Sequence, residues 1–240
     1  MIVTNADFDC GALLERLAAD GLPADAKIIY RGRNTVAEAD GLCVKAFAVP
    51  GVIKGLIYGI FRSPKAKRAY ENALRLGSMD IYTPEPAGYI LNKVGPLLRQ
   101  SYYVCAMLEG YSELRGIEKR ADFDALADAL AAFIYSLHRK GVFFKDFTQG
   151  NILFKKEDDT YRFALVDINR MVFGVSDHRR LYENFGSTLD TEAGQRAMAR
   201  RYAALAGDPS LADDLMEIYR RRQAKLWRKR RLKERLRGRK

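Results

Sequence analysis

The stretch from Lys140 to Arg170, KGVFFKDFTQGNILFKKEDDTYRFALVDINR, decides the fold. Asp146 and Asn151 are five residues apart, and two strand-like segments, NILF and YRFALVDI, follow with the polar turn KKEDDT between them. A hairpin of these strands would return Asp167 beside the first two side chains. Two carboxylates and one amide provide a proton acceptor and the hard oxygen ligands that Mg²⁺ prefers. The pattern therefore indicates phosphoryl transfer from a nucleoside triphosphate.

Each of the three residues has its own expected role. Asp167 and Asn151 would bind Mg²⁺, and Asp146 would accept or orient the proton of the attacking hydroxyl. The D-x-x-x-x-N spacing alone is weak, because about one aspartate in twenty-five would match it by chance. Its context supports it, since FDALADALAAFIYSLHRKG predicts a helix directly before the loop, with Asp122 as N-cap and Gly141 after its end.

Two residues upstream fit the same chemistry. A kinase needs a strand lysine that holds the phosphates and a helical carboxylate that positions this lysine. Lys45 lies in the alternating segment GLCVKAF, which predicts a strand. Glu71 lies in SPKAKRAYENALRLG, which predicts a helix with Ser63 as its cap and Pro64 at its first position. An isolated lysine of this kind is usually a solvated strand residue, but the order of these residues along the chain favours a Lys45–Glu71 pair.

The chain also resembles a known family. The segments that carry the resemblance are RGRNTV, VKAF, SPKAKRAYENALRL, TPEPAGYI, SYYV, LHRKGVFFKDFTQGNILF and LVDINRMVFG, which cover most of residues 28–174. They look like the bacterial lipopolysaccharide kinases of the Kdo and heptose kinase superfamily, and KAKRAYENAL and VDINR point to the Kdo-kinase branch.

The resemblance implies a protein-kinase-like enzyme that uses ATP and Mg²⁺. Its expected substrate is an inner-core sugar of lipopolysaccharide at the cytoplasmic face of the inner membrane, most specifically Kdo on Kdo-lipid A. Carried over residue by residue, it implies that Lys45 contacts the phosphates and pairs with Glu71. It likewise implies that Asp146 is the catalytic aspartate and that Asn151 and Asp167 bind the metal.

The chain departs from the kinase pattern at three places. Phe144 and Lys145 stand where many relatives have a His and a basic residue, and a Phe keeps only the packing role of that His. Thr148 stands where protein kinases place a lysine, so Lys145 becomes the candidate for neutralising the γ-phosphate. Ile168 and Asn169 replace Phe and Gly after the metal-binding aspartate, which favours a constitutively assembled site over a flipping activation segment.

The expected nucleotide-covering loop is RGRNTV, which contains one glycine. Such a loop offers few backbone N–H groups to a phosphate. We assign Gly32 and Asn34 to nucleotide binding, with an ordinary hairpin glycine as the equal alternative for Gly32.

The resemblance implies a two-lobed α+β unit with a protein-kinase-like fold, and the length of the chain suffices for one such unit. The chain has 240 residues, and 48% of them are hydrophobic, which suffices for a sizeable core. We expect a small, mainly β N-terminal lobe with one helix over residues 1–108 and a larger, mainly helical lobe over 109–218. Adenine would bind in the cleft near a hinge at Glu109 and Gly110.

Cysteine, histidine and hydropathy patterns limit the alternatives. Three cysteines and two histidines are too few for a disulfide framework or a zinc site, and we expect His138 to be a hydrogen-bonded packing residue. The first residues, MIVTNADFDCGALLERL, show no signal-peptide pattern, and no apolar run approaches the roughly 18 residues that a membrane span needs. We therefore expect a cytoplasmic protein, peripheral at the inner face of the inner membrane.

Residues 219–240, YRRRQAKLWRKRRLKERLRGRK, form a strongly basic tail. It contains 13 Lys or Arg and one Glu, a net charge of +12 against +11 for the whole chain, so the remaining residues sum to −1. We predict a basic amphipathic tail, with apolar residues at Leu226, Trp227, Leu232 and Leu236, that lies on an anionic membrane surface. A solvated helix end is the structural alternative, and a nucleic-acid contact is the weaker functional one.

A second candidate for membrane contact is VPGVIKGLIYGIFRSPKAKR, between the Lys45 strand and the Glu71 helix. Core packing against the small lobe is the slightly favoured interpretation of this segment, ahead of lipid contact. For the function as a whole, a small atypical protein kinase and a nucleotide-binding scaffold without turnover are the alternatives to a lipopolysaccharide sugar kinase.

Overall fold

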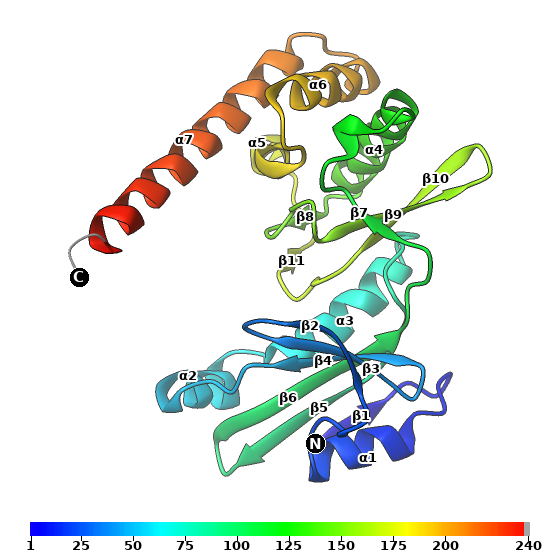
Figure 1. Cartoon of the computed structure of the whole chain (residues 1–240), viewed down its shortest axis with the longest axis vertical. Coiled ribbons are helices and arrows are strands. Elements are labelled where there is room, and N and C mark those ends of the chain that lie inside the picture. Colours follow the sequence, from blue (N-terminus) through cyan, green and yellow to red (C-terminus); the bar gives the residue numbers. More distant parts are fainter. Residues whose placement is uncertain (238–240) are drawn as a thin grey trace. The chain divides into compact units, whose positions relative to one another are not determined.

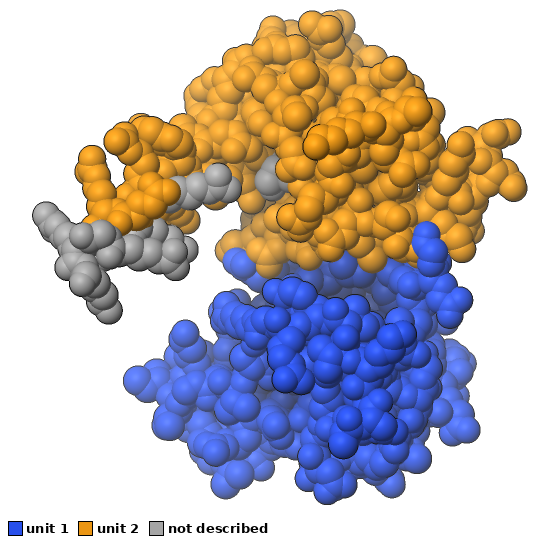
Figure 2. Space-filling view, viewed as in Figure 1, with its two compact units in different colours: residues 1–110, 165–170 blue, residues 111–164, 171–240 orange. Residues whose placement is uncertain are grey.

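The computed structural model describes residues 1–237, apart from the side chains at positions 187, 230, 233, 236 and 237. Residues 238–240 of the predicted tail and the side chain of Leu236 lie outside the described residues. The chain forms two compact units (Figure 2). Unit 1 contains Met1–Gly110 together with Leu165–Arg170, and unit 2 contains Tyr111–Ala164 and Met171–Lys240. A short segment from late in the sequence therefore belongs to the N-terminal unit.

Unit 1 is built on a six-stranded antiparallel sheet with the strand order β1-β5-β6-β4-β3-β2 (Figure 1). The strands are β1 (Ile2–Thr4), β2 (Lys27–Arg31), β3 (Thr35–Ala39), β4 (Leu42–Phe47), β5 (Pro86–Val94) and β6 (Leu97–Ala106). The helices are α1 (Gly11–Ala19), α2 (Val52–Leu56), the π-helical turn η1 (Ile57–Phe61) and α3 (Lys65–Gly77).

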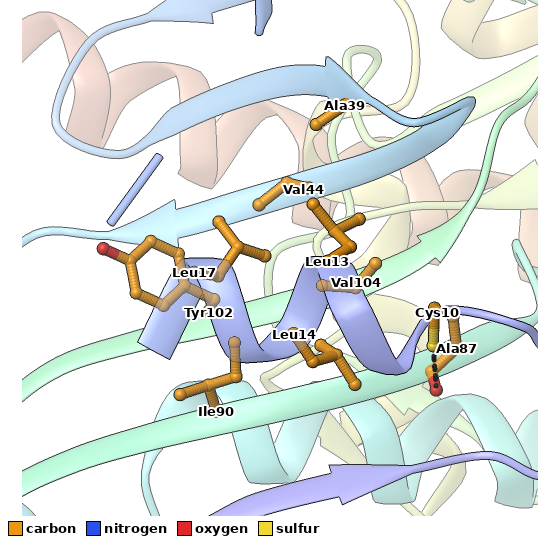
Figure 3. Close-up of a cluster of buried hydrophobic side chains, with 10 residues drawn as sticks. All are labelled: Cys10, Leu13, Leu14, Leu17, Ala39, Val44, Ala87, Ile90, Tyr102 and Val104. Atoms are coloured by element: carbon orange, nitrogen blue, oxygen red, sulfur yellow. Dashed lines mark hydrogen bonds between the residues drawn. The ribbon is translucent and has the colours of Figure 1, made fainter. Parts of the chain in front are cut away.

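Helices α1 and α3 cover opposite faces of the sheet of unit 1. Because successive strand residues point to opposite faces, Tyr102 and Val104 of β6 pack with α1, whereas Tyr103 and Cys105 pack with α3. Figure 3 shows the α1 side, where leucines of α1 contact Val44 and Ile90. The odd-numbered residues of β4 therefore face α3, and Lys45 is one of them.

Unit 2 is mainly helical. Its helices are α4 (Phe123–Arg139), α5 (His178–Tyr182), α6 (Glu192–Ala206) and α7 (Leu211–Arg237), with 3-10 turns η2 (Ile117–Lys119) and η3 (Glu183–Ser187). Its short strands are β7 (Ser112–Glu113), β8 (Phe143–Phe144), β9 (Ile152–Glu157), β10 (Thr160–Leu165) and β11 (Met171–Val172). They form a three-stranded sheet in the order β10-β9-β7 and a two-stranded sheet of β8 and β11. The core of the unit includes the packing of α6 on α4 and α7.

The helix ends follow the sequence signals in part. Gly141 ends α4 with φ +65°, and Val142 N donates to Leu137 O at 2.9 Å, as expected for a glycine after a helix. Asp122 is the N-cap residue of α4, but its carboxylate binds Arg120 and not the helix N–H groups. The predicted cap of α3 is wrong, because Pro64 takes the N-cap position and the Ser63 hydroxyl is buried without a hydrogen-bond partner.

The helix α7 continues from unit 2 into the predicted tail without a break. Leu215, Met216 and Tyr219 are buried, whereas Leu226, Trp227 and Leu232 are exposed. At about 100° per residue these last three side chains point in widely different directions, so the tail has no single apolar face among the described residues and is basic rather than amphipathic. No helix in residues 1–237 has the length and hydropathy of a membrane span.

Candidate active site

The centre of the site in unit 1 is an ion pair between Lys45 and Asp167. The Lys45 ammonium lies 2.6 Å from Asp167 Oδ1, and the lysine side chain is only 15% exposed. Lys45 reaches this position because its place in β4 points it to the α3 face of the sheet, beside Phe47. The structure thus brings together two predicted site residues that are 122 positions apart in the sequence.

Asp167 is placed by hydrogen bonds from the rest of unit 1. Leu165 N donates to Tyr82 O at 3.1 Å, and the hydroxyl of Thr83 donates to Leu165 O at 2.7 Å. On the other side of the aspartate, Asn72 of α3 donates to Ile168 O at 2.7 Å, and the Ile168 side chain is buried. The segment is therefore held on both sides of Asp167 by unit 1, through α3 and the loop that follows it.

The backbone of Asp167 has φ +57°, in the left-handed region that few residues other than glycine adopt. Aspartate tolerates this region better than most residues, and strain of this kind is found where the surrounding structure determines the conformation. Asn169, which is also buried, donates from its amide to Asp167 Oδ1 at 2.5 Å. The residue that replaces the glycine of the kinase pattern thus holds the aspartate directly.

Glu71 does not form the predicted pair with Lys45. Its carboxylate lies 3.6 Å from Lys67 on the same helix and is 52% exposed. The face of α3 that packs on the sheet contains Ala66, Ala69 and Ala73, and Glu71 lies about 200° around the helix from Ala69. The partner of Lys45 is Asp167, so the assignment of Glu71 is corrected.

A second ammonium group, that of Lys65, lies near the Lys45–Asp167 pair. Lys65, in the first turn of α3, has its ammonium 5.7 Å from the Phe47 ring centroid, and Lys45 lies 5.6 Å from the same centroid. Burial lowers the pKa of Lys65, with a further decrease from the charge of Arg33. Burial likewise lowers the pKa of Arg68, whose Nε is buried without a hydrogen-bond partner. This concentration of positive charge around one carboxylate is suited to polyphosphate.

The loop that contains Asp146 lies in unit 2, where Asn151 holds its backbone. The Asn151 amide donates to Asp146 O at 2.8 Å, and Asn151 N donates to Thr148 O at 2.9 Å. An amide that donates through its nitrogen presents its oxygen as a ligand or acceptor. Lys145 is exposed beside this pair. The Asn151 side chain is therefore linked to the backbone carbonyl of Asp146.

A buried chain of polar groups supports the start of this loop. His138 Nδ1 lies 2.8 Å from the Tyr202 hydroxyl and its Nε2 lies 3.3 Å from Asn184 Oδ1, while the Asn184 amide donates to Phe144 O at 2.7 Å. Because Asn184 Oδ1 accepts, His138 donates from Nε2 and accepts the tyrosine proton at Nδ1, as a neutral imidazole does. Burial lowers the pKa of His138 to about 4. This role for Asn184 and Tyr202 was not predicted from the sequence, because both residues come from helical segments far along the chain.

The segment with Gly32 and Asn34 is a tight hairpin between β2 and β3. Gly32 N donates to Asn34 O at 3.1 Å, and Asn34 Oδ1 accepts from Ala48 N at 3.2 Å. Gly32 therefore acts here as the hairpin glycine of the alternative interpretation, and the Asn34 side chain ties the hairpin to the end of β4. Their contact with a nucleotide stays a prediction.

Each unit offers an oxygen of the kind that Mg²⁺ requires. In unit 1, both observed contacts of Asp167 use Oδ1, and in unit 2, Asn151 presents an amide oxygen. Within residues 1–237 no group of three His, Cys, Asp or Glu side chains is arranged to bind a metal.

Comparisons with known proteins identify the family. Residues 50–202 match the Lipopolysaccharide kinase (Kdo/WaaP) family. The chain belongs to this family. The matched range contains Asp146, Asn151 and Asp167, whereas Lys45 precedes it. Membership implies an ATP-dependent kinase that acts on the lipopolysaccharide core.

Solved structures show the fold of this lipopolysaccharide kinase. WaaP in complex with acyl carrier protein matches with a TM-score of 0.60 and 18% identity, over 93% of this chain and 98% of that one. The Rio2 kinase-ADP/Mg²⁺-phosphoaspartate complex from Chaetomium thermophilum matches with a TM-score of 0.48 and 17% identity, over 93% of this chain and 78% of that one. Among curated proteins no sequence matches. The protein-kinase-like fold predicted from the sequence is confirmed by the match to WaaP.

Proposed function

We propose that this kinase transfers the γ-phosphoryl group of ATP to a hydroxyl of Kdo on Kdo-lipid A. Family membership supports the reaction class. The single observation that supports the proposal is the Lys45–Asp167 ion pair at 2.6 Å, because these are the residues to which we assign phosphate binding and metal binding. The Kdo specificity rests on the sequence resemblance to the Kdo-kinase branch.

The proposed roles in unit 1 follow from charge. Lys45 would bind the phosphates of ATP, and Lys65 would add a second ammonium from α3. Asp167 would hold Mg²⁺, which would neutralise charge on the phosphate oxygens. Lys65 compensates for a glycine-poor hairpin, which offers the triphosphate few N–H groups.

The proposed roles in unit 2 belong to the loop held by Asn151. Asp146 orients the acceptor hydroxyl and takes its proton, while Asn151 provides an amide oxygen for the metal. Lys145 supplies the positive charge that Thr148 does not, near the transferred phosphoryl group. We propose that these groups and those of unit 1 act on one ATP molecule.

For the acceptor, Arg170 is the candidate ligand. It is the last residue of the segment Leu165–Arg170, and its charge adds to the burial that lowers the pKa of Arg68. Kdo carries a carboxylate, which an arginine binds in a bidentate manner. The basic residues of the tail would hold the kinase at an anionic membrane surface, where a lipid-linked acceptor lies.

The test is an acceptor panel read by mass spectrometry. Purified kinase with ATP and Mg²⁺ is incubated with lipid A precursors that carry or lack Kdo, with Asp146→Ala as the inactive control. We expect one phosphate added only to the acceptors with Kdo. Equal phosphorylation of precursors without Kdo would refute the proposed acceptor, and phosphorylation of none would refute the proposed activity.

A further inference from the structure

The segment Val52–Phe61, formed by α2 and η1, packs on unit 1 through its glycines. A Cβ added to Gly55 would lie 2.5 Å from Leu97 Cδ1 and 2.9 Å from Leu98 O. A Cβ added to Gly59 would lie 1.7 Å from Pro96 O, and the Lys93 ammonium donates to Gly59 O at 3.0 Å. The backbone of the segment therefore lies directly on the turn and strand β6 of the β5–β6 hairpin, and only glycine fits there.

The large apolar side chains of the segment consequently point away from the protein. Ile53 is 76% exposed and Phe61 is 83% exposed. We call the outward set the apolar ridge; it consists of Val52, Ile53, Leu56, Ile57, Ile60 and Phe61. A surface helix of a globular protein normally turns its apolar stripe to the core, and this one does the reverse. The core-packing interpretation favoured from the sequence is therefore wrong for these side chains.

The charge around the apolar ridge has one sign. Between Phe47 and Tyr70 the sequence contains five basic residues and no acidic one. Lys54 is exposed on α2 itself, and the Arg62 guanidinium lies 5.7 Å from the Tyr58 ring centroid at the end of η1. A second copy of the chain docked on this ridge would bring these cations together without a counter-charge. A membrane with anionic lipids complements both features, because its acyl chains match the apolar ridge and its head groups match the basic residues around it.

We propose that the apolar ridge inserts into a membrane that contains anionic lipids, with Lys54 and Arg62 at the level of the head groups. A helix with one apolar face and a basic border binds in this way, lying in the interface plane. Gly55 and Gly59 let the segment rest on the rigid hairpin, so unit 1 is held at the lipid surface. The inference extends the proposed function, because a lipid-linked acceptor lies in that surface, but the binding itself requires no ATP.

The first test measures vesicle binding by flotation of the full chain without nucleotide. Vesicles of phosphatidylcholine are compared with vesicles that also contain phosphatidylglycerol. We expect binding to the anionic vesicles, and Ile53→Ser/Phe61→Ser should weaken it at least about tenfold, because two large apolar side chains are lost. Ile29→Ser/Tyr30→Ser is the matched control, since it replaces an exposed isoleucine and an exposed aromatic residue on β2. The control should bind like the unmodified chain.

The second test reports insertion directly. Trp227 is the only tryptophan, so Phe61→Trp in a Trp227→Phe background places a single fluorophore on the apolar ridge. We expect its emission to shift to the blue on anionic vesicles and to be quenched by lipids with brominated acyl chains. Absence of both signals, or equal vesicle binding by the Ile53→Ser/Phe61→Ser variant and the matched control, would overturn the proposal.

Binding of either of two other partners to the apolar ridge would also overturn the proposal. A concentration-dependent dimer that Ile53→Ser/Phe61→Ser abolishes, without vesicle binding, would make the ridge an interface between copies. Binding of an acyl carrier protein through the apolar ridge, again without vesicle binding, would make it a protein-docking surface. Thermal unfolding of each variant confirms that its fold is retained. Because no step uses ATP, failure here is distinguishable from failure of the proposed kinase activity.

Discussion

Replacement of His138 by glutamine should remove a pH dependence of the free energy of unfolding. This dependence comes from the buried imidazole in the hydrogen-bonded chain that supports the Asp146 loop. His138 is 4% exposed, and burial lowers its pKa from 6.5 to about 4. The unfolded chain therefore binds a proton more readily than the folded chain between these pH values. The stabilisation is complete above pH 6.5 and is lost as the pH falls toward 4.

The size of the effect follows from the two pKa values. A pKa difference of about 2.5 corresponds to a limit of about 3 kcal/mol in the free energy of unfolding. About 2 kcal/mol of this should be lost between pH 7.5 and pH 5. Glutamine can hydrogen bond with Tyr202 and Asn184 but does not titrate. His138→Gln should consequently show a much shallower decrease over the same range.

Urea unfolding at pH 7.5 and pH 5 measures this difference. The chain offers a matched control in His178→Gln, because His178 is exposed and lies outside the hydrogen-bonded chain. The control should keep most of the pH dependence of the unmodified protein. If the unmodified protein and His138→Gln lose the same free energy of unfolding over this range, the assignment of a buried neutral imidazole is refuted.

Three further predictions concern catalysis. Glu71→Ala should change kcat by less than about threefold, because its carboxylate is exposed and pairs with Lys67 on its own helix, whereas Asp167→Asn should lower kcat by about 10²-fold or more; equal losses would restore the Glu71 assignment. Lys65→Met should raise the Kd for ATP about tenfold, measured by calorimetry, with the half-exposed Lys67→Met as the matched control; equal effects of the two variants would refute the phosphate role of Lys65. Asp146→Ala should lower the rate of transfer by about 10²–10⁴-fold while ATP binding is retained, and a near-normal rate would show that another group handles the proton.

Much of the fold could be predicted because its signals are local. The alternating apolar residues of GLCVKAF, the periodicity of α4 and the glycine after its end each specify structure over a few residues. The position of Leu165–Arg170 in unit 1 depends instead on hydrogen bonds from Asn72 and Thr83, nearly a hundred residues earlier. Nothing local to the VDINR segment encodes those partners.

The error at Glu71 has a definite physical cause. The prediction used residue type and order along the chain but not the direction of the side chain on its helix. The small residues Ala66, Ala69 and Ala73 recur at helical spacing and mark the buried face, which places Glu71 on the solvent side. The same pattern, with Asn72 next to Ala73, would have indicated which residues of α3 face the Asp167 segment.

The outward direction of the apolar ridge could not be predicted from hydrophobicity. An apolar stretch indicates a buried surface but does not distinguish burial in protein from burial in lipid. The decisive signal is the Gly55–Gly59 spacing, since glycines four apart on a helix allow backbone contact along one face. The contact itself could not be predicted from the sequence, because it depends on the position of the β5–β6 hairpin on which the segment packs.

The way in which Asp167 is held has a consequence for control in the cell. Protein kinases are commonly switched by ordering or displacing the segment that follows this aspartate. Here Asn169, two residues after Asp167, donates to its carboxylate, and Asn72 of α3 donates to Ile168 O. These hydrogen bonds leave the segment little freedom to move in response to a covalent modification. We therefore expect an enzyme that is constitutively active, with a rate that depends on the supply of its acceptor.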